Sequence, residues 1–146
     1  MIRRLIPFLF LATFSIGQEP ESLLKKTFPM PQMIHHRPPW PFFKGRPYYL
    51  ELFSDLPQNE VESLTLFFKT DQTIQYREVP LQPYRGRYRF KYDPDLHPGK
   101  EITYFFVAIM KLAGSYATPV DENGKLVPMI INPIDPAKYY ESIAPK

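Results

Sequence analysis

The stretch from Tyr84 to Ala108, YRGRYRFKYDPDLHPGKEITYFFVA, decides the fold class of this chain. In its first half, basic and aromatic residues alternate strictly. The basic residues are Arg85, Arg87, Arg89 and Lys91, and the aromatic residues between them are Tyr88, Phe90 and Tyr92. A period of two is typical of a β-strand with one solvated and one buried face. Turn-forming residues and a second β-rich run, Ile102–Ile109, follow, so the stretch predicts two strands of an antiparallel all-β domain.

Short β-rich runs separated by turn residues continue on both sides of this stretch. The predicted strands are Tyr48–Phe53, Val61–Thr70, Thr73–Val79, Arg85–Tyr92, Glu101–Met110, Gly114–Ala117 and Leu126–Asn132. About seven short strands with turn signals roughly every 8 to 12 residues are the pattern of an immunoglobulin-like sandwich. We therefore predict one immunoglobulin-like antiparallel β-sandwich over residues 48–132.

The N-terminus has the features of a secretory signal peptide. Arg3 and Arg4 precede an apolar run from Leu5 to Ile16, and small residues lie at the end of that run. The run has about 12 residues, against the roughly 20 that a membrane-spanning helix needs. We expect residues 1–17 to be cleaved after Gly17; the alternative is an uncleaved anchor, the only way in which we expect the chain to contact a membrane.

Composition indicates a folded, exported domain. The chain has no cysteine, which excludes disulfides and thiolate metal sites, and export without disulfides favours a bacterial periplasm or exterior. Without residues 1–17, 16 Lys and Arg face 15 Asp and Glu, so the charge predicts no nucleic-acid partner. Ten Tyr and twelve Phe are far more aromatic residues than a disordered chain would carry.

Proline divides the rest of the chain. Residues 18–47 form a polar and then Pro-rich arm, in which proline excludes helix. This arm contains the only tryptophan, Trp40, followed by Phe42. The tail, residues 133–146, holds a short segment, Ala137–Ser142, that could form one helical turn.

Several short motifs occur in an order shared with exported bacterial modules. They are Pro38-Pro39 with Gly45-Arg46-Pro47, Leu66-Phe67-Phe68, Gly86-Arg87-Tyr88 through Asp93-Pro94, Gly99, Ile102–Ala108, Gly114 and Ala117-Thr118-Pro119. On these motifs, residues 38–132 resemble immunoglobulin-like or fibronectin-III-like modules, which serve adhesion, spacing, assembly and substrate docking alike. Ile109-Met110 stands where that family often has an acidic residue.

A second resemblance is to glycogen-binding carbohydrate modules. It rests on Gly86-Arg87-Tyr88, Pro98-Gly99 and Tyr104-Phe105-Phe106. The tryptophans on which those modules stack sugars are missing, because Trp40 lies far upstream.

Two surfaces are candidates for binding a ligand or partner. The first is the basic strand face of Arg85, Arg87, Arg89 and Lys91, spaced about 6.6 Å apart along one strand and able to meet carboxylates or phosphates. The alternative is a solvated face that pairs with Glu51, Glu78 or Glu101 of neighbouring strands. The second candidate is the arm with Trp40 and Phe42, whose alternative role is to fill a gap in the core.

Catalytic and metal-binding signals are weak. The chain lacks a nucleophile elbow, a phosphate loop and a His-Glu-x-x-His motif. His35 and His36 diverge as neighbours, and a metal site would require His97 to join them. We therefore predict no enzyme, cofactor or metal, but an exported envelope module that binds a protein partner. The alternative is a carbohydrate-binding module. Exposed aromatic residues on a flat sheet face would favour carbohydrate binding. An unpaired edge strand beside the basic residues would favour a protein partner.

Overall fold

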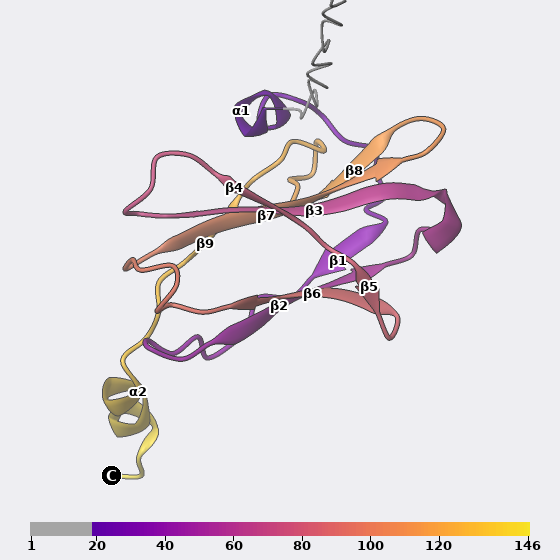
Figure 1. The fold of residues 1–146 in the computed structure, drawn as a ribbon. Coiled ribbons are helices and arrows are strands. Elements are labelled where there is room, and N and C mark those ends of the chain that lie inside the picture. Colours follow the sequence, from indigo (N-terminus) through magenta and orange to yellow (C-terminus); the bar gives the residue numbers. More distant parts are fainter. Residues whose placement is uncertain (1–18) are drawn as a thin grey trace, which may run out of the picture.

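The computed structural model describes residues 19–146, which form an all-β sandwich of two antiparallel sheets (Figure 1). The predicted signal peptide lies outside the described residues. The strands are β1 (Ile34–His36), β2 (Tyr48–Ser54), β3 (Val61–Thr70), β4 (Arg77–Pro80), β5 (Pro83–Tyr84), β6 (Arg87–Tyr92), β7 (Ile102–Met110), β8 (Ser115–Thr118) and β9 (Met129–Ile131). The helices are α1 (Pro20–Leu23) and α2 (Pro136–Ile143), with a 3₁₀ turn at Gln58–Glu60. Neither α-helix within residues 19–146 has the length and apolar character that crossing a membrane requires.

The two sheets have the strand orders β1-β2-β6-β5 and β4-β3-β7-β8. Strand β9 pairs with β7 as well, beyond the end of β8. In Figure 1 the first sheet is the lower layer and the second is the upper layer. All strand pairs are antiparallel, and β3 with β7 is the longest ladder. The all-β class is therefore as predicted, with nine strands instead of seven.

The main core lies between the sheets and follows from the alternation of each strand. On β6, Tyr88 and Tyr92 point inward and are buried, whereas Arg87, Arg89 and Lys91 point outward. The inward side chains of β2, β3 and β7 meet them, and the fully buried ones are Leu50, Leu52, Leu64, Leu66, Phe68, Ile102, Tyr104, Phe106 and Ala108. Burial of these large apolar side chains is the dominant favourable contribution to folding.

A second, smaller core covers the outer face of the upper sheet. The sequence predicts β7 to be apolar on both faces, and Phe105 and Val107 are indeed buried on the side away from the main core. The Pro-rich part of the arm, residues 29–47, is the cover that the sequence suggests for one face of this strand. Instead, Leu23 and Phe28 from the polar part that precedes it cover these side chains, together with Leu126. Helix α1 lies above the upper sheet in Figure 1.

Two short strands were not predicted, because each has only two or three residues and shows no alternating pattern of its own. Strand β1 lies in the arm between prolines and pairs with the far end of β2, with Ile34 opposite Ser54. Strand β5 pairs with the start of β6, with Tyr84 opposite Arg87. Both lie at the edges of the four-stranded sheet.

The boundaries of other elements also shift. The third predicted strand began at Thr73, but β4 begins at Arg77, because Thr70 and Thr73 bond to each other and hold a longer turn. The helical turn predicted in the tail is α2, which is eight residues long. Its N-terminus is capped by Asp135, whose carboxylate accepts a hydrogen bond from the Ala137 amide at 2.9 Å.

Candidate binding surface

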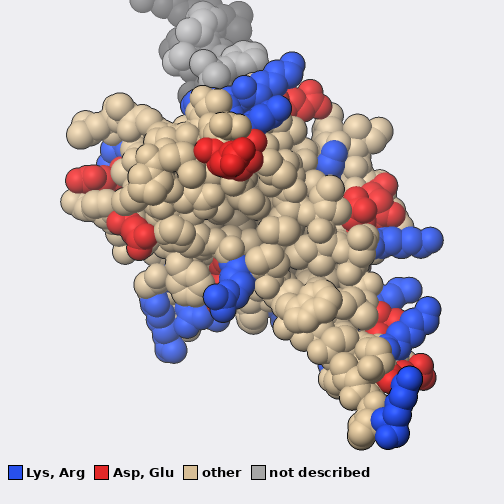
Figure 2. Space-filling model, turned by 180° about the vertical axis from the view of Figure 1, so that it is seen from behind, with Lys and Arg blue, Asp and Glu red and all other residues tan. Residues whose placement is uncertain are grey.

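The solvent side of the four-stranded sheet carries most of the predicted site. We call it the outer face and define it by the outward-pointing residues of four strands. They are His35 of β1, Tyr49, Glu51 and Phe53 of β2, Arg87, Arg89 and Lys91 of β6, and Tyr84 of β5. Figure 2 shows Lys and Arg side chains projecting from the underside of the molecule, the side on which this sheet lies in Figure 1.

Three aromatic side chains of the outer face are unusually open to solvent. Tyr49 is 48 %, Phe53 46 % and Tyr84 42 % exposed. A single exposed apolar side chain is common, but several on one sheet face form an apolar patch of the kind that marks interaction sites. Aromatic rings interleaved with arginines are therefore a chemical property of this face that needs a functional explanation.

Arg89 lies between two of these rings. Its guanidinium carbon is 4.7 Å from the ring centroid of Tyr49 and 4.2 Å from that of Tyr84. Neither tyrosine is directly opposite Arg89 in the sheet; Tyr49 pairs with Lys91, and Tyr84 with Arg87. The two diagonal contacts are cation–π interactions that hold a long side chain in one position.

Arg87 is neutralised within the sheet. Its Nη1 donates to both carboxylate oxygens of Glu51 at 3.1 Å. The sequence named Glu51, Glu78 and Glu101 as possible partners of the basic residues, and Glu51 is the one that pairs. Within residues 19–146, neither Arg89 nor Lys91 has a carboxylate within 4.0 Å.

Arg85 does not belong to the strand face as predicted. It lies in the two-residue turn between β5 and β6 with φ of +49°, followed by Gly86 with φ of +78°. Positive φ at both positions is the geometry of a type I′ hairpin, whose twist matches that of the strands. The Arg85 guanidinium lies 5.2 Å from the Tyr84 ring centroid, so it is beside the outer face but not in line with the other cations.

A groove of about 810 Å³ borders the outer face. One wall is the chain from His35 to Trp40, and the other side is formed by Tyr49, Glu51 and Phe53 of β2. Trp40 is 77 % exposed at this groove. The arm thus presents one large apolar side chain to solvent beside a sheet face that is already rich in aromatic rings.

Phe42, the other residue predicted in the arm, has the opposite environment. It is 2 % exposed and stacks on Tyr48 with ring centroids 4.4 Å apart. Its side chain belongs to the main core and is not at the surface where a partner could contact it. The arm was considered either to bind a partner or to fill a gap in the core. Phe42 fills the core, whereas Trp40 stays exposed.

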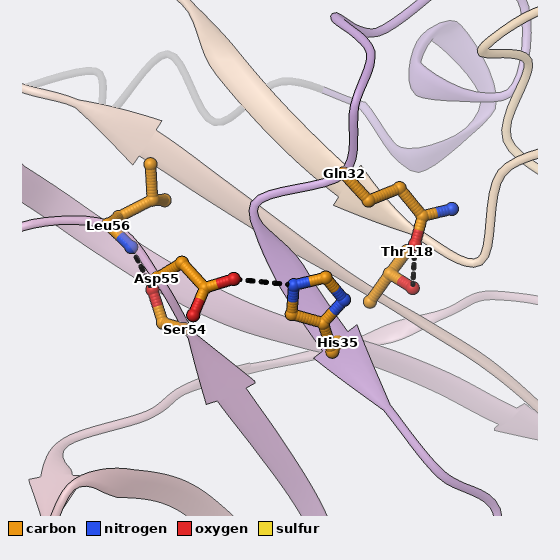
Figure 3. Close-up of polar contacts among 6 residues, drawn as sticks. All are labelled: Gln32, His35, Ser54, Asp55, Leu56 and Thr118. Carbon is orange, nitrogen blue, oxygen red and sulfur yellow. Dashed lines mark hydrogen bonds and ion pairs between the residues drawn. The ribbon is translucent and has the colours of Figure 1, made fainter.

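The three histidines occupy separate places. His35 bonds Asp55 at 2.8 Å on the surface, near the link between Gln32 and Thr118 that ties the arm to β8 (Figure 3). His97 contacts Arg77 at 3.3 Å, and its pKa is lowered by burial and by that charge. Within the part of the chain that the structure describes, no cluster of three or more potential metal ligands occurs.

His36 points inward and joins the two sheets. Its Nδ1 donates to the backbone carbonyl of Glu51 at 2.6 Å, and its Nε2 accepts from the Tyr104 hydroxyl at 2.6 Å. Because a carbonyl can only accept, Nδ1 carries a proton, and in the neutral imidazole the Tyr104 hydroxyl donates to Nε2. Burial lowers the pKa of His36, in agreement with that assignment, and raises the pKa of Tyr104.

Tyr49, Phe53 and Tyr84 were not among the surface residues predicted from the sequence. The signal for the first two was present, since Leu50 and Leu52 are predicted to face inward and the residues between them must then face outward. No local signal brings Tyr84 and Tyr49 to the two sides of Arg89, because that arrangement depends on pairing between β2, β6 and β5.

A scan against protein-family models found no match to this chain, and a search of curated proteins found none either.

Proposed function

We propose that this protein is a non-catalytic, exported binding module of the bacterial cell envelope that binds a protein partner through the outer face. The observation that carries the proposal is the set of exposed tyrosine, phenylalanine and arginine side chains on one sheet face beside an exposed tryptophan. Tyr, Trp and Arg are the residues that dominate binding energy at protein–protein interfaces.

The order of the strands supports an immunoglobulin-like module. If β1, β2, β5 and β6 are taken as strands A, B, D and E, the lower sheet has the order ABED. If β3, β7 and β8 are taken as C, F and G, the upper sheet has the order CFG, with β4 added beside C. Such modules act by presenting surfaces, which agrees with a binding role.

The short edge strands of the lower sheet favour binding through the side chains of the outer face over addition of a partner strand to the sheet edge. Strand β1 has three residues and β5 has two, so neither edge offers a partner strand many backbone hydrogen bonds. The basic residues lie on β6, which is an inner strand of this sheet, so they are not beside an unpaired edge strand of the kind expected for a protein partner. A partner is therefore expected to contact side chains and not to extend the sheet. The exposed aromatic residues of the face meet the criterion given for a carbohydrate module, so the choice between the two ligands depends on the arginine contacts.

Carbohydrate binding is the second candidate, and the groove beside Trp40 favours it. An exposed tryptophan with Tyr49 and Phe53 near it offers rings on which a sugar could stack. Against it, Arg89 occupies one face of the Tyr49 ring and one face of the Tyr84 ring, and stacking needs an open ring face. The arginine contacts therefore favour the protein partner.

The test is a cross-linked pull-down from bacterial envelope extract. The purified protein is compared with a Tyr49→Ser/Phe53→Ser variant and with an Ile74→Ser/Leu112→Ser control, whose residues are 94 % and 97 % exposed away from the outer face. We expect one specific protein with the wild type and the control, and its loss with the outer-face variant. If the wild type, the outer-face variant and the control all retain the same partner, the outer face is not the binding site. If a glycan co-elutes and no protein does, carbohydrate binding is favoured.

A further inference from the structure

The outer face has more positive than negative charge at its centre. Three cations of β6 project from it, and the one carboxylate among them, Glu51, is directly opposite Arg89 in the sheet but bonds to Arg87. Arg89 and Lys91 therefore keep their charge without a carboxylate partner within residues 19–146. A ligand with carboxylates would complement this face better than a neutral ligand.

Arg89 is already held in position for such a ligand. Contacts with the Tyr49 and Tyr84 rings, at 4.7 and 4.2 Å, restrict a side chain that otherwise has many rotamers. A guanidinium held beside aromatic rings still has N–H groups with which to bind a carboxylate. Less conformational entropy is then lost when the ligand binds.

The spacing of the cations matches a ligand peptide in an extended conformation. Arg87, Arg89 and Lys91 are alternate residues of one strand, so their side chains repeat every two residues, or about 6.6 Å. An extended peptide with acidic side chains at alternate positions has the same repeat. The groove with Trp40 and Phe53 lies beside this row and could take an apolar residue of the same peptide.

We propose that the ligand of the outer face is an extended acidic segment of a partner protein, whose Asp or Glu carboxylates bind Arg89 and Lys91. This inference rests on the proposed function and specifies the chemistry of the partner. Arg89 is its central contact, because it combines an unpaired charge with a fixed orientation.

The sole tryptophan provides the measurement. Trp40 is the only tryptophan in the chain and is exposed at the groove, so its emission reports on ligand at this face. The probe is a synthetic peptide in which Glu alternates with Thr, compared with the same peptide carrying Gln in place of Glu. Titration calorimetry on the same pairs gives affinity independently of the emission change, and polygalacturonate serves as a carboxylate polymer that is not a peptide.

We expect the Glu peptide to bind at least about tenfold more tightly than the Gln peptide, and less tightly at higher salt. Arg89→Gln should lose about tenfold or more, and Arg89→Lys should also lose affinity, because lysine lacks the planar fork. Arg77→Gln, on β4 of the other sheet, is the matched control and should leave the affinity unchanged. Circular dichroism and urea unfolding confirm that each variant is folded.

Three results overturn the inference. They are equal affinity for the Glu and Gln peptides, unchanged affinity in Arg89→Gln, and no binding of either peptide at about 1 mM. Arg89-dependent binding of polygalacturonate without binding of the Glu peptide would assign the carboxylates to a glycan instead. If the pull-down needs Tyr49 and Phe53 but is insensitive to Arg89→Gln and to salt, the proposed function stands and only the acidic ligand is wrong.

Discussion

His36 links the two sheets through one side chain. It lies on the edge strand β1, yet it bonds the β2 backbone on one side and the Tyr104 hydroxyl of β7 on the other. Its ring also contacts Phe106, with centroids 5.0 Å apart. Protonation would place a second proton on Nε2, so that the Tyr104 hydroxyl would have to turn and accept instead of donate, and a charge would lie beside the core.

This arrangement predicts that the protein loses stability in mild acid. Because the pKa of His36 is lowered in the folded state, the unfolded chain binds more protons once the pH falls below about 6.5. The free energy of unfolding should be constant above that pH and should decrease as the pH falls toward the lowered pKa. Urea unfolding between pH 7.5 and pH 5.5 measures the change.

Single substitutions separate the contributions of His36 and His97 to the pH dependence. The pKa of His97 is lowered as well, so His36→Gln should remove part of the pH dependence and His97→Gln another part. An unchanged slope in His36→Gln would show that the link to Tyr104 is not sensitive to protonation.

At the scale of elements, two glycines in turns adopt backbone conformations that the sandwich requires. Gly86 ends the hairpin turn between β5 and β6, and Gly124 lies in the turn that precedes Leu126. Their φ angles are +78° and +77°, a region that other residues adopt only with strain. Around Gly86 there is open space, whereas a Cβ on Gly124 would lie 2.4 Å from the carbonyl oxygen of Phe28.

Replacing each of these two glycines by alanine should lower the free energy of unfolding by a different amount. Gly86→Ala should lower the free energy of unfolding by about 1 to 2 kcal/mol through backbone strain alone. Gly124→Ala should cost more, because the clash also disturbs the bond from the Phe28 amide to the Gly124 carbonyl, which is 2.8 Å long. Urea unfolding of both variants measures the difference, and equal costs would mean that the segment at Phe28 yields without penalty.

At the scale of the whole molecule, the chain is a sandwich with a cover on one side. The segment at residues 20–28 buries Leu23 and Phe28 against Phe105 of β7, so the outer side of the upper sheet is closed. The outer side of the lower sheet stays open and carries the candidate binding surface. The two sheets thus differ in exposure: residues 20–28 cover the outer side of the upper sheet, whereas the outer side of the lower sheet faces solvent.

This division predicts that the cover contributes to stability. Leu23→Ala should lower the free energy of unfolding by about 2 to 4 kcal/mol, since Leu23 is 2 % exposed in the second core. Leu112→Ala is the matched control: the same substitution at a leucine that is 97 % exposed should change stability by less than about 0.5 kcal/mol. A similarly small effect of Leu23→Ala would mean that the cover is only loosely attached.

The sequence by itself determined the fold class and the direction of most side chains. The alternation from Arg87 to Tyr92 places the tyrosines in the core and the cations outside, as the structure confirms. The apolar faces of β7 likewise predicted that both sides of this strand would be buried. These results follow because the two faces of a strand are set by a local period of two, which is visible without knowing the neighbouring strands.

The tertiary structure alone decided which segments meet. It placed β1 on β2 within an arm whose prolines had excluded only helix, buried Phe42 while exposing Trp40, and moved Arg85 into a turn. It also brought Tyr49 and Tyr84 to the two sides of Arg89. A periodic pattern specifies a side of a strand but not its partner, and the pairing of distant strands depends on how all the buried surfaces fit together at once.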